Sequence, residues 1–153
     1  RGGNFARTML RLAQTRDSLS VVADQFGAPT SAELLADVTA HALSTLRLDH
    51  SAGGVYHCAA AGETSWFEYA HFVLATAKGL GVELRVQPDQ VRPITTNEYP
   101  TAACRPLNSR LDTRALCATF GLSLPLWQTG VLRMMHEVVE LDGIEPSTST
   151  MPL

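Results

Sequence analysis

The sequence lacks the signatures of several protein classes. Its three cysteines, Cys58, Cys104 and Cys117, have no metal-ligand spacing and form no C-x-x-C pair. We therefore expect free thiols in a reducing, cytoplasmic compartment. No run approaches the roughly 18 consecutive apolar residues of a membrane span, and the N-terminus has no apolar signal-peptide core. We expect no membrane partner, and the net charge of −3 gives no reason to expect nucleic acid.

What remains is the composition of one ordinary globular domain. The 153 residues are 45% hydrophobic and 18% charged, which excludes a disordered chain or a coiled coil. The last stretch differs, because residues 141–153 are rich in Ser, Thr and Pro and show no apolar periodicity. We expect a folded part over residues 1–140 and a disordered tail over 141–153.

Apolar spacing predicts an alternation of helices and strands. Helices are expected over 3–15, 31–46, 65–78, 112–120 and 125–140, and strands over 19–22, 54–60 and 82–86. The patterns Thr30-x-x-Glu33 and Ser65-x-x-Glu68 predict capping boxes at two of these helices. Residues 87–110 carry four prolines and are expected to form a long irregular loop, of a kind that is often functional.

Segment 54–60 is nearly all apolar or aromatic, as is typical of a strand buried on both faces of a parallel sheet. One such strand cannot form a doubly wound sheet. The chain is therefore either a small α+β domain or part of a larger α/β sheet whose other strands are absent.

Seven motifs follow one another along residues 2–140. They are Gly-Asn-Phe-Ala-Arg-Thr-Met-Leu-Arg-Leu (3–12), Asp-Gln-Phe-Gly-Ala-Pro-Thr (24–30), Glu-Leu-Leu-Ala-Asp (33–37), Gly-Val-Tyr-His (54–57), Thr-Ser-Trp-Phe-Glu-Tyr-Ala (64–70), Tyr-Pro-Thr-x-Ala-x-Arg-Pro-x-Asn-Ser-x-Leu (99–111) and the helix that carries Trp127. In this order and spacing, they resemble the C-terminal half of the dTDP-4-dehydrorhamnose reductase family, which belongs to the extended short-chain dehydrogenases.

The resemblance implies an α/β fold class: the C-terminal part of a Rossmann-like extended short-chain dehydrogenase, with one main-sheet strand and the small substrate-binding α/β subdomain. It also implies a reaction, the reduction by NADPH (or NADH) of dTDP-6-deoxy-L-lyxo-4-hexulose to dTDP-L-rhamnose. The dTDP-sugar would be the substrate, and the complete enzyme would be a homodimer.

The catalytic half of such an enzyme is missing from these residues. No glycine-rich turn that would hold a cofactor pyrophosphate follows a strand. The family protonates the developing alkoxide with a Tyr-x-x-x-Lys pair. Lys78 is the only lysine here, and Leu74 stands four positions before it. We therefore expect an N-terminal Rossmann half as partner, no catalytic or cofactor-binding residue in this chain, and no activity for the chain alone.

Four residues are candidate ligands of the nucleotide sugar. Arg105 lies in the proline-rich loop near Asn108, and its forked guanidinium suits the diphosphate; alternatively, it pairs with a surface carboxylate. Gln25 and Asn4 are candidates for bonds to sugar hydroxyls. The alternative for Gln25 is that it and Asp24 satisfy backbone groups of their loop.

Two acidic residues, Glu33 and Glu137, match positions at which members of the family hold Mg²⁺ near the dimer contact. Because Mg²⁺ takes few protein carboxylates and keeps waters, two glutamates would suffice, helped by one from the missing half. The alternatives are a capping-box role for Glu33 and an exposed helical position for Glu137. Trp66 and Trp127 are expected to be packing anchors.

Two other functions stay open at this point. One is a non-catalytic relative that regulates another enzyme, which the sequence upstream of residue 1 would distinguish by the loss of its Tyr-x-x-x-Lys pair. The other is a sister nucleotide-sugar epimerase or dehydratase, against which the Asp24–Thr30 motif and the Glu33-Leu-Leu-Ala-Asp motif both argue.

Overall fold

The computed structural model describes residues 4–141. The predicted tail lies almost entirely outside this range. The elements in chain order are α1 (Phe5–Thr15), β1 (Ser20–Val22), β2 (Phe26–Gly27), α2 (Ala32–Leu46), η1 (His50–Ala52), β3 (Thr64–Ser65), α3 (Trp66–Gly79), η2 (Pro88–Gln90), β4 (Arg92–Ile94), η3 (Thr96–Glu98), α4 (Arg114–Phe120) and α5 (Trp127–Leu141). All five predicted helices are present, with ends shifted by one or two residues.

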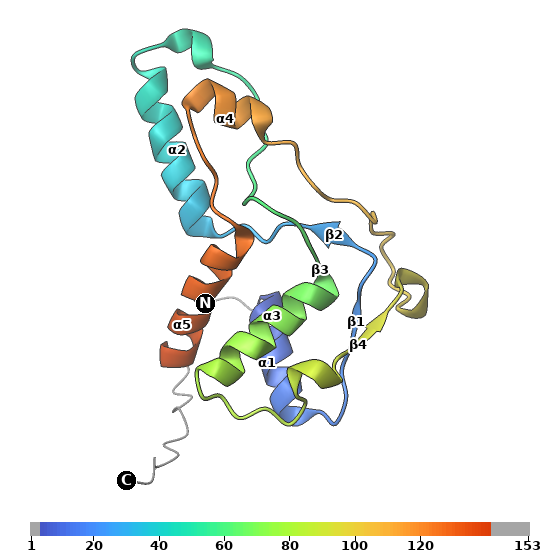
Figure 1. Cartoon of the computed structure of the whole chain (residues 1–153). Helices are drawn as coiled ribbons and strands as arrows, with labels where there is room; N and C mark the ends of the chain where they lie inside the picture. The colour runs from blue at the N-terminus through green and yellow to red at the C-terminus, as the bar shows by residue number, and fades with distance from the viewer. Residues whose placement is uncertain (1–3, 142–153) are drawn as a thin grey trace, which may run out of the picture.

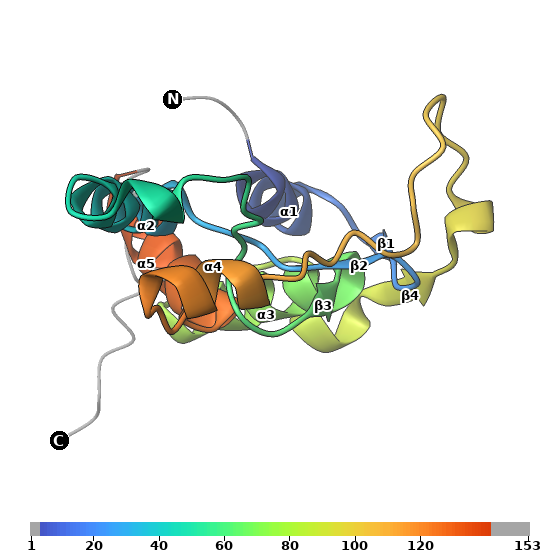
Figure 2. The ribbon, with the colours of Figure 1, turned by 90° about the horizontal axis from the view of Figure 1, so that it is seen from above.

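The main core lies where α1 and α5 pack against α3 (Figure 1). Its largest fully buried side chains are Leu74, Met135, Val73 and Val86. Seen from above, α1 and α2 lie in one layer and α3, α4 and α5 in a second, while the segment after η3 projects away from both (Figure 2). This arrangement places the first turns of α1 and α3 close together.

A second, smaller core holds α2 and α4 together at the end of the molecule away from β1 and β4 (Figure 1). Val38 of α2 packs there with Leu116 and Phe120 of α4, and the rings of Tyr56 and Phe120 meet edge to face at 5.0 Å. Cys58 lies against this core, and all three cysteines are free thiols as predicted. Val38 is the only buried residue of the 15-residue helix α2, so most of this helix faces solvent.

Two short sheets connect distant parts of the chain. β1 pairs in parallel with β4, with Val21 opposite Pro93. β2 pairs antiparallel with β3, with Phe26 opposite Ser65. Pro93 is tolerated because the ladder uses its neighbours: Arg92 N donates to Leu19 O, and Ala23 N donates to Ile94 O. The two sheets bring residues 20–27 alongside residues 64–65 and 92–94.

The strand predicted over 54–60 does not form among residues 4–141, and the larger sheet expected to cover it stays a prediction. These residues are extended but pair with no strand among residues 4–141, and Val55 is 97% exposed. Backbone hydrogen bonds hold only the end of the segment, where Ala60 N donates to Thr30 Oγ1 at 3.1 Å and Ala61 N donates to Pro125 O at 2.8 Å. An apolar run forms a central strand only where neighbouring strands complete its hydrogen bonds, and the described residues offer none.

The expected strand over 82–86 is also absent, although its alternation does bury Val82 and Val86. The backbone of Val86 donates to Ala13 O at the end of α1 instead of joining a ladder. Three strands were missed, β2, β3 and β4, and β4 lies inside the proline-rich region expected to be irregular. The alternating apolar residues of segment 82–86 therefore predicted correctly which side chains are buried, but not which backbone groups pair.

Side-chain caps set the helix starts. The capping box of Ser65 and Glu68 at α3 is confirmed, with Glu68 N to Ser65 Oγ at 3.1 Å and Ser65 N to Glu68 Oε2 at 3.0 Å. The box predicted at Thr30 is wrong, because Ser31 is the N-cap of α2 and accepts from Leu34 N. Thr30 instead donates to Ala28 O while accepting from Ala60 N. Glu33 is thus an exposed first-turn residue rather than part of a capping box.

Gly130 marks a close contact between two helices that a substitution can test. A Cβ added there would lie 3.2 Å from Ser31 Cβ, so α5 passes close to the start of α2. We expect Gly130→Leu to lower the free energy of unfolding by about 1–3 kcal/mol through overpacking. Gly79→Ala is the control, since a Cβ there meets nothing within 4 Å. Urea unfolding followed by helical circular dichroism should separate the two variants, and equal stabilities would contradict the close contact.

Candidate functional site

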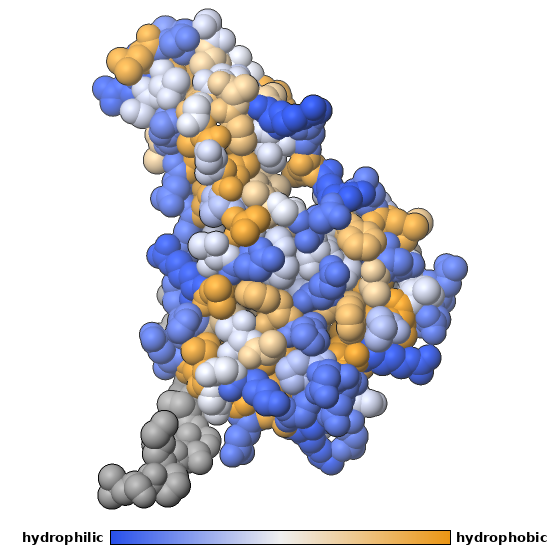
Figure 3. All heavy atoms as spheres, in the orientation of Figure 1, coloured by the Kyte–Doolittle hydropathy of each residue, from blue (hydrophilic) through white to orange (hydrophobic). Residues whose placement is uncertain are grey.

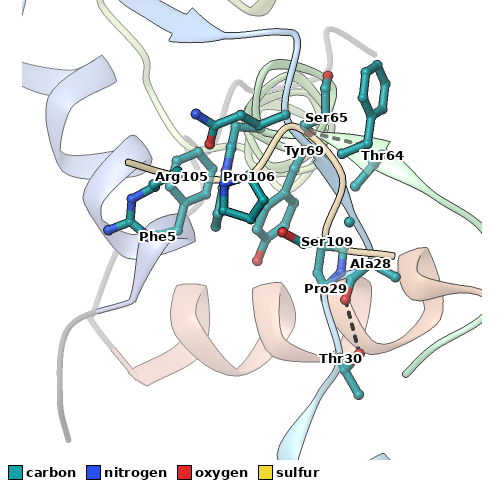
Figure 4. A pocket seen from close by; sticks show the side chains of 14 residues that line it. Phe5, Ala28, Pro29, Thr30, Thr64, Ser65, Tyr69, Arg105, Pro106 and Ser109 are labelled. Carbon is teal, nitrogen blue, oxygen red and sulfur yellow. Dashed lines mark hydrogen bonds between the residues drawn. The ribbon is translucent and has the colours of Figure 1, made fainter. Parts of the chain in front are cut away.

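A cavity of about 430 Å³ opens between the start of α1, the segment that follows β1, the start of α3 and the loop around residue 105 (Figure 4). This volume is within the range of small-molecule sites. The lining residues are Phe5, Gln25, Phe26, Gly27, Ala28, Pro29, Thr30, Thr64, Ser65, Trp66, Tyr69, Arg105, Pro106 and Ser109. Four of the resemblance motifs, 3–12, 24–30, 64–70 and 99–111, therefore meet at one cavity, although they lie far apart in sequence.

Backbone hydrogen bonds hold the loop around residue 105 across the cavity. Phe26 N donates to Leu107 O at 2.9 Å, and Ser109 N donates to Phe26 O at 2.8 Å. Just beyond, the guanidinium of Arg110 pairs with Glu63. A segment without helix or ladder of its own is thereby held at a defined place, and it brings Arg105 and Pro106 to the cavity.

Aromatic rings form one wall. The ring centroid of Phe5 lies 4.7 Å from that of Trp66 and 5.1 Å from that of Tyr69. Trp127 packs edge to face behind Tyr69 at 5.9 Å. Tyr69 is buried, and this burial raises its pKa, so its hydroxyl is neutral at physiological pH. Such a wall presents flat apolar surface to a ligand.

Sequence reasoning missed this wall. Trp127 is buried as the predicted anchor, but Trp66 is 39% exposed and lines the cavity. A signal was present, because Trp66 and Tyr69 are three residues apart on a predicted helix and therefore share a face. Phe5 carried no such signal, since only the packing of α1 against α3 brings it to the same place.

Two predicted ligand residues, Arg105 and Gln25, are brought together at the cavity. Arg105 is exposed and makes no ion pair within residues 4–141, so the alternative of a paired surface arginine does not hold for this part of the chain. Gln25 is only 9% exposed, and its Nε2 donates to Thr96 Oγ1 at 3.1 Å. Asp24 in turn accepts from Thr96 N at 2.9 Å, as expected for a residue that satisfies loop backbone.

The other two, Asn4 and Asn108, do not line the cavity. Asn4 is the N-cap of α1, and its Oδ1 accepts from Arg7 N at 2.8 Å. Asn108 Oδ1 accepts from both N and Nε of Arg110, at 3.1 and 2.9 Å. Both side chains have structural partners, and their predicted contacts with a sugar stay predictions.

The two glutamates predicted for Mg²⁺ lie on different helices, Glu33 on α2 and Glu137 on α5. Glu137 pairs with Arg133 one turn earlier, at 3.6 Å. Among residues 4–141 there is no cluster of three or more His, Cys, Asp or Glu side chains that could hold a metal ion. The described residues therefore do not fit a magnesium site by themselves.

The described residues also do not form a dinucleotide site. Gly79 is the last residue of α3 and Gly81 follows it, so this glycine pair ends a helix instead of opening one. Leu74, which occupies the tyrosine position relative to Lys78, is fully buried. None of the helices within residues 4–141 has both the length and the apolar character that crossing a membrane requires.

Comparison with known proteins agrees with this description. Residues 1–140 match the model of the family described as "RmlD substrate binding domain". The dTDP-4-dehydrorhamnose reductase of Escherichia coli K12 is 48% identical over 144 residues, which are 94% of this chain and 48% of that protein. The reductase of Burkholderia thailandensis is 46% identical over 86% of this chain and 45% of its own length. The chain thus spans about half the length of these relatives.

Solved structures of reductases show the same fold. The Bacillus anthracis dTDP-4-dehydrorhamnose reductase, in complex with NADP, matches 90% of this chain and 44% of its own at a TM-score of 0.70 and 35% identity. The Clostridium acetobutylicum reductase matches the same shares at a TM-score of 0.72 and 33% identity. These matches confirm the α/β fold class expected from the sequence. The chain belongs to the RmlD substrate binding domain family.

Proposed function

We propose that the chain is the substrate-binding portion of a dTDP-4-dehydrorhamnose reductase, whose catalytic and cofactor-binding residues belong to an N-terminal Rossmann half. The observation that carries the proposal is the cavity, where an unpaired arginine stands beside an aromatic wall. The relatives support it, because they bear the reductase name and are about twice as long as the matched residues. The same names favour a reductase over an epimerase or dehydratase.

The cavity offers the chemistry that a thymidine diphosphate sugar needs. Phosphate oxygens suit the fork of Arg105, which has no competing carboxylate among the described residues. The rings of Phe5, Trp66 and Tyr69 offer apolar surface to the flat parts of the ligand. The buried amide of Gln25 adds a hydrogen-bonding group that can orient the ligand in the cavity.

In the complete enzyme, NADPH held by the N-terminal half would supply a hydride for the reduction of the C4 ketone. The residues of this chain bind and orient the sugar nucleotide so that its ketone meets the other half in one geometry, which lowers the entropic part of the barrier. The homodimer expected from the resemblance stays a prediction, and sedimentation of the complete enzyme tests it.

The test uses a reconstituted reductase, in which residues 1–153 are joined behind the N-terminal half of the E. coli relative. We expect it to oxidise NADPH when given dTDP-6-deoxy-L-lyxo-4-hexulose. Arg105→Ala should raise KM for the sugar nucleotide about tenfold or more, because a hydrogen bond to a charged group contributes about 1.5–3 kcal/mol. The value of kcat should change less, since the diphosphate is remote from the reacting ketone.

Two further variants make this result specific. Arg105→Lys keeps the charge without the fork and should recover only part of the affinity. Arg11→Ala removes an exposed arginine of α1 that does not line the cavity, and it should leave KM unchanged. An unchanged KM for Arg105→Ala would make Arg105 a surface residue and remove the main support for this site.

A further inference from the structure

A chain of hydrogen bonds runs from the loop after β1 to the cavity. Thr96, the first residue of η3, donates through its hydroxyl to Asp24 Oδ1 at 2.7 Å and through its backbone N–H to the same carboxylate at 2.9 Å. Its Oγ1 also meets Gln25 Nε2 at 3.1 Å. Thr96 is 72 positions from Asp24 and 71 positions from Gln25 in sequence. Of the three residues, Gln25 is the one that lines the cavity.

Only one assignment of donors and acceptors fits these hydrogen bonds. The hydrogen bonds from the Thr96 side chain and backbone hold the pKa of Asp24 below its usual value, so its carboxylate is ionised at neutral pH and only accepts. The single hydroxyl proton of Thr96 is therefore used on Asp24, and Thr96 Oγ1 can only accept from Gln25. The amide must turn its NH₂ group toward Thr96, and its Oε1 lies at the other end.

Gln25 Oε1 is left without a protein partner. No residue among 4–141 donates to it. The oxygen is accessible to solvent. Among the described residues, the only side-chain N or O atom that is both buried and unpartnered is Gln128 Oε1, so the unpartnered Gln25 Oε1 is not fully buried. A reachable oxygen on a side chain that is itself 9% exposed is a site for a ligand hydrogen bond.

We propose that Asp24 and Thr96 are positioning residues that fix the amide of Gln25, so that the cavity presents a hydrogen-bond acceptor and selects a ligand with a donor at that point. The inference rests on the proposed function for the ligand itself. In a dTDP-sugar, the donors are the imide N–H of thymine and the hydroxyls of the two sugars. A ligand that presents an acceptor there meets a carbonyl oxygen that cannot rotate away without breaking the bond to Thr96.

Thr96→Val in the reconstituted reductase tests this relay, the hydrogen-bonded series Asp24–Thr96–Gln25. Without the hydroxyl, the amide of Gln25 is free to rotate, and we expect the Kd for dTDP-sugar to rise about 3- to 10-fold, the range of one neutral hydrogen bond, with kcat nearly unchanged. Thr96→Ser restores the hydroxyl and should recover most of the affinity. Asp24→Asn should resemble Thr96→Val, because an amide at position 24 can donate to Thr96 and release its proton toward Gln25.

The neighbouring threonine provides a matched control. Thr95 Oγ1 donates to Glu98 Oε2 at 2.9 Å and takes no part in the relay. Thr95→Val therefore makes the same change one residue away and should leave the Kd at the wild-type value. If Thr95→Val raised the Kd for dTDP-sugar as much as Thr96→Val does, the loss would come from a general effect of valine on η3. That result would contradict the proposed relay.

A double-mutant cycle separates positioning from general support of the loop. If Thr96 acts only through Gln25, then Thr96→Val should cost no further affinity in a Gln25→Ala background. Full additivity of the two losses would contradict the proposal. So would a Kd for Thr96→Val equal to that of the wild type.

Two ligands show where the donor lies. Calorimetry with dTDP alone should show the loss in Thr96→Val if the donor is on the nucleotide, whereas a loss confined to the dTDP-sugar assigns it to a hydroxyl of the hexose. Failure of the proposed function looks different, since the wild-type reconstituted reductase would then bind neither ligand. Wild-type binding with no loss in any relay variant overturns the relay alone.

Discussion

Residues 1–153 alone are expected to leave NADPH unoxidised in the presence of dTDP-6-deoxy-L-lyxo-4-hexulose. The reason is local: the position four residues before Lys78 is occupied by the buried Leu74, and no glycine turn opens a helix among residues 4–141. General acid catalysis by itself is worth about 10²–10⁴-fold, so its loss together with the cofactor site should bring turnover below detection.

A fluorescence titration completes this test. The chain alone should show no saturable NADPH binding, while the reconstituted reductase should show it. Micromolar binding by residues 1–153 would mean that a cofactor site exists here after all, and the division of the enzyme into two halves would be wrong.

The isolated chain is also expected to bind a hydrophobic dye and to elute as an oligomer. Leu35 and Leu43 of α2 are 42% and 58% exposed, and Val55 of the unpaired segment is almost fully exposed. Figure 3 shows hydrophobic side chains over this end of the molecule, where α2 and α4 lie. Each such side chain stabilises a fold by roughly 1.5–3 kcal/mol when it becomes fully buried. Net domain stability is only about 5–15 kcal/mol, so a few missing contacts weaken the chain.

Two substitutions locate the responsible surface. Leu35→Ser together with Leu43→Ser should reduce both dye binding and association. Leu132→Ser on α5 removes a leucine of similar exposure, 41%, and should change neither. Joining the N-terminal half should also suppress both effects. A dye-negative monomer with a sharp, cooperative melt would show instead that the chain is a self-sufficient domain.

Local patterns predicted the helices well and the strands poorly. Helices such as α3 carry their own signals, here the Ser65–Glu68 box at one end and Gly79 at the other. Strand β4 has no such signal, because only the distant β1 completes its hydrogen bonds. Segment 54–60 shows the converse case: its apolar sequence predicted a strand, but the partners that would make it one are not among the described residues. Whether a segment is a strand depends on its neighbours.

The candidate site was predictable in the same uneven way. Arg105 and Gln25 stood out by residue type and motif, and both line the cavity. Asn4 and Asn108 also carry amides that can bind a hydroxyl, yet their oxygens accept hydrogen bonds from neighbouring residues. The relay through Thr96 could not be seen in the sequence, because nothing local links residue 96 to residue 24. Residue type gives the possible partners of a side chain, and only packing selects among them.

The most direct test of the account is product formation by the two halves together. The N-terminal half of the E. coli reductase should make no dTDP-L-rhamnose from dTDP-6-deoxy-L-lyxo-4-hexulose and NADPH when it is alone. Joined to residues 1–153 it should make the product, and Arg105→Ala should raise KM about tenfold or more. A folded reconstituted protein that binds NADPH but forms no dTDP-L-rhamnose would contradict the claim that these residues bind the substrate of a dTDP-4-dehydrorhamnose reductase.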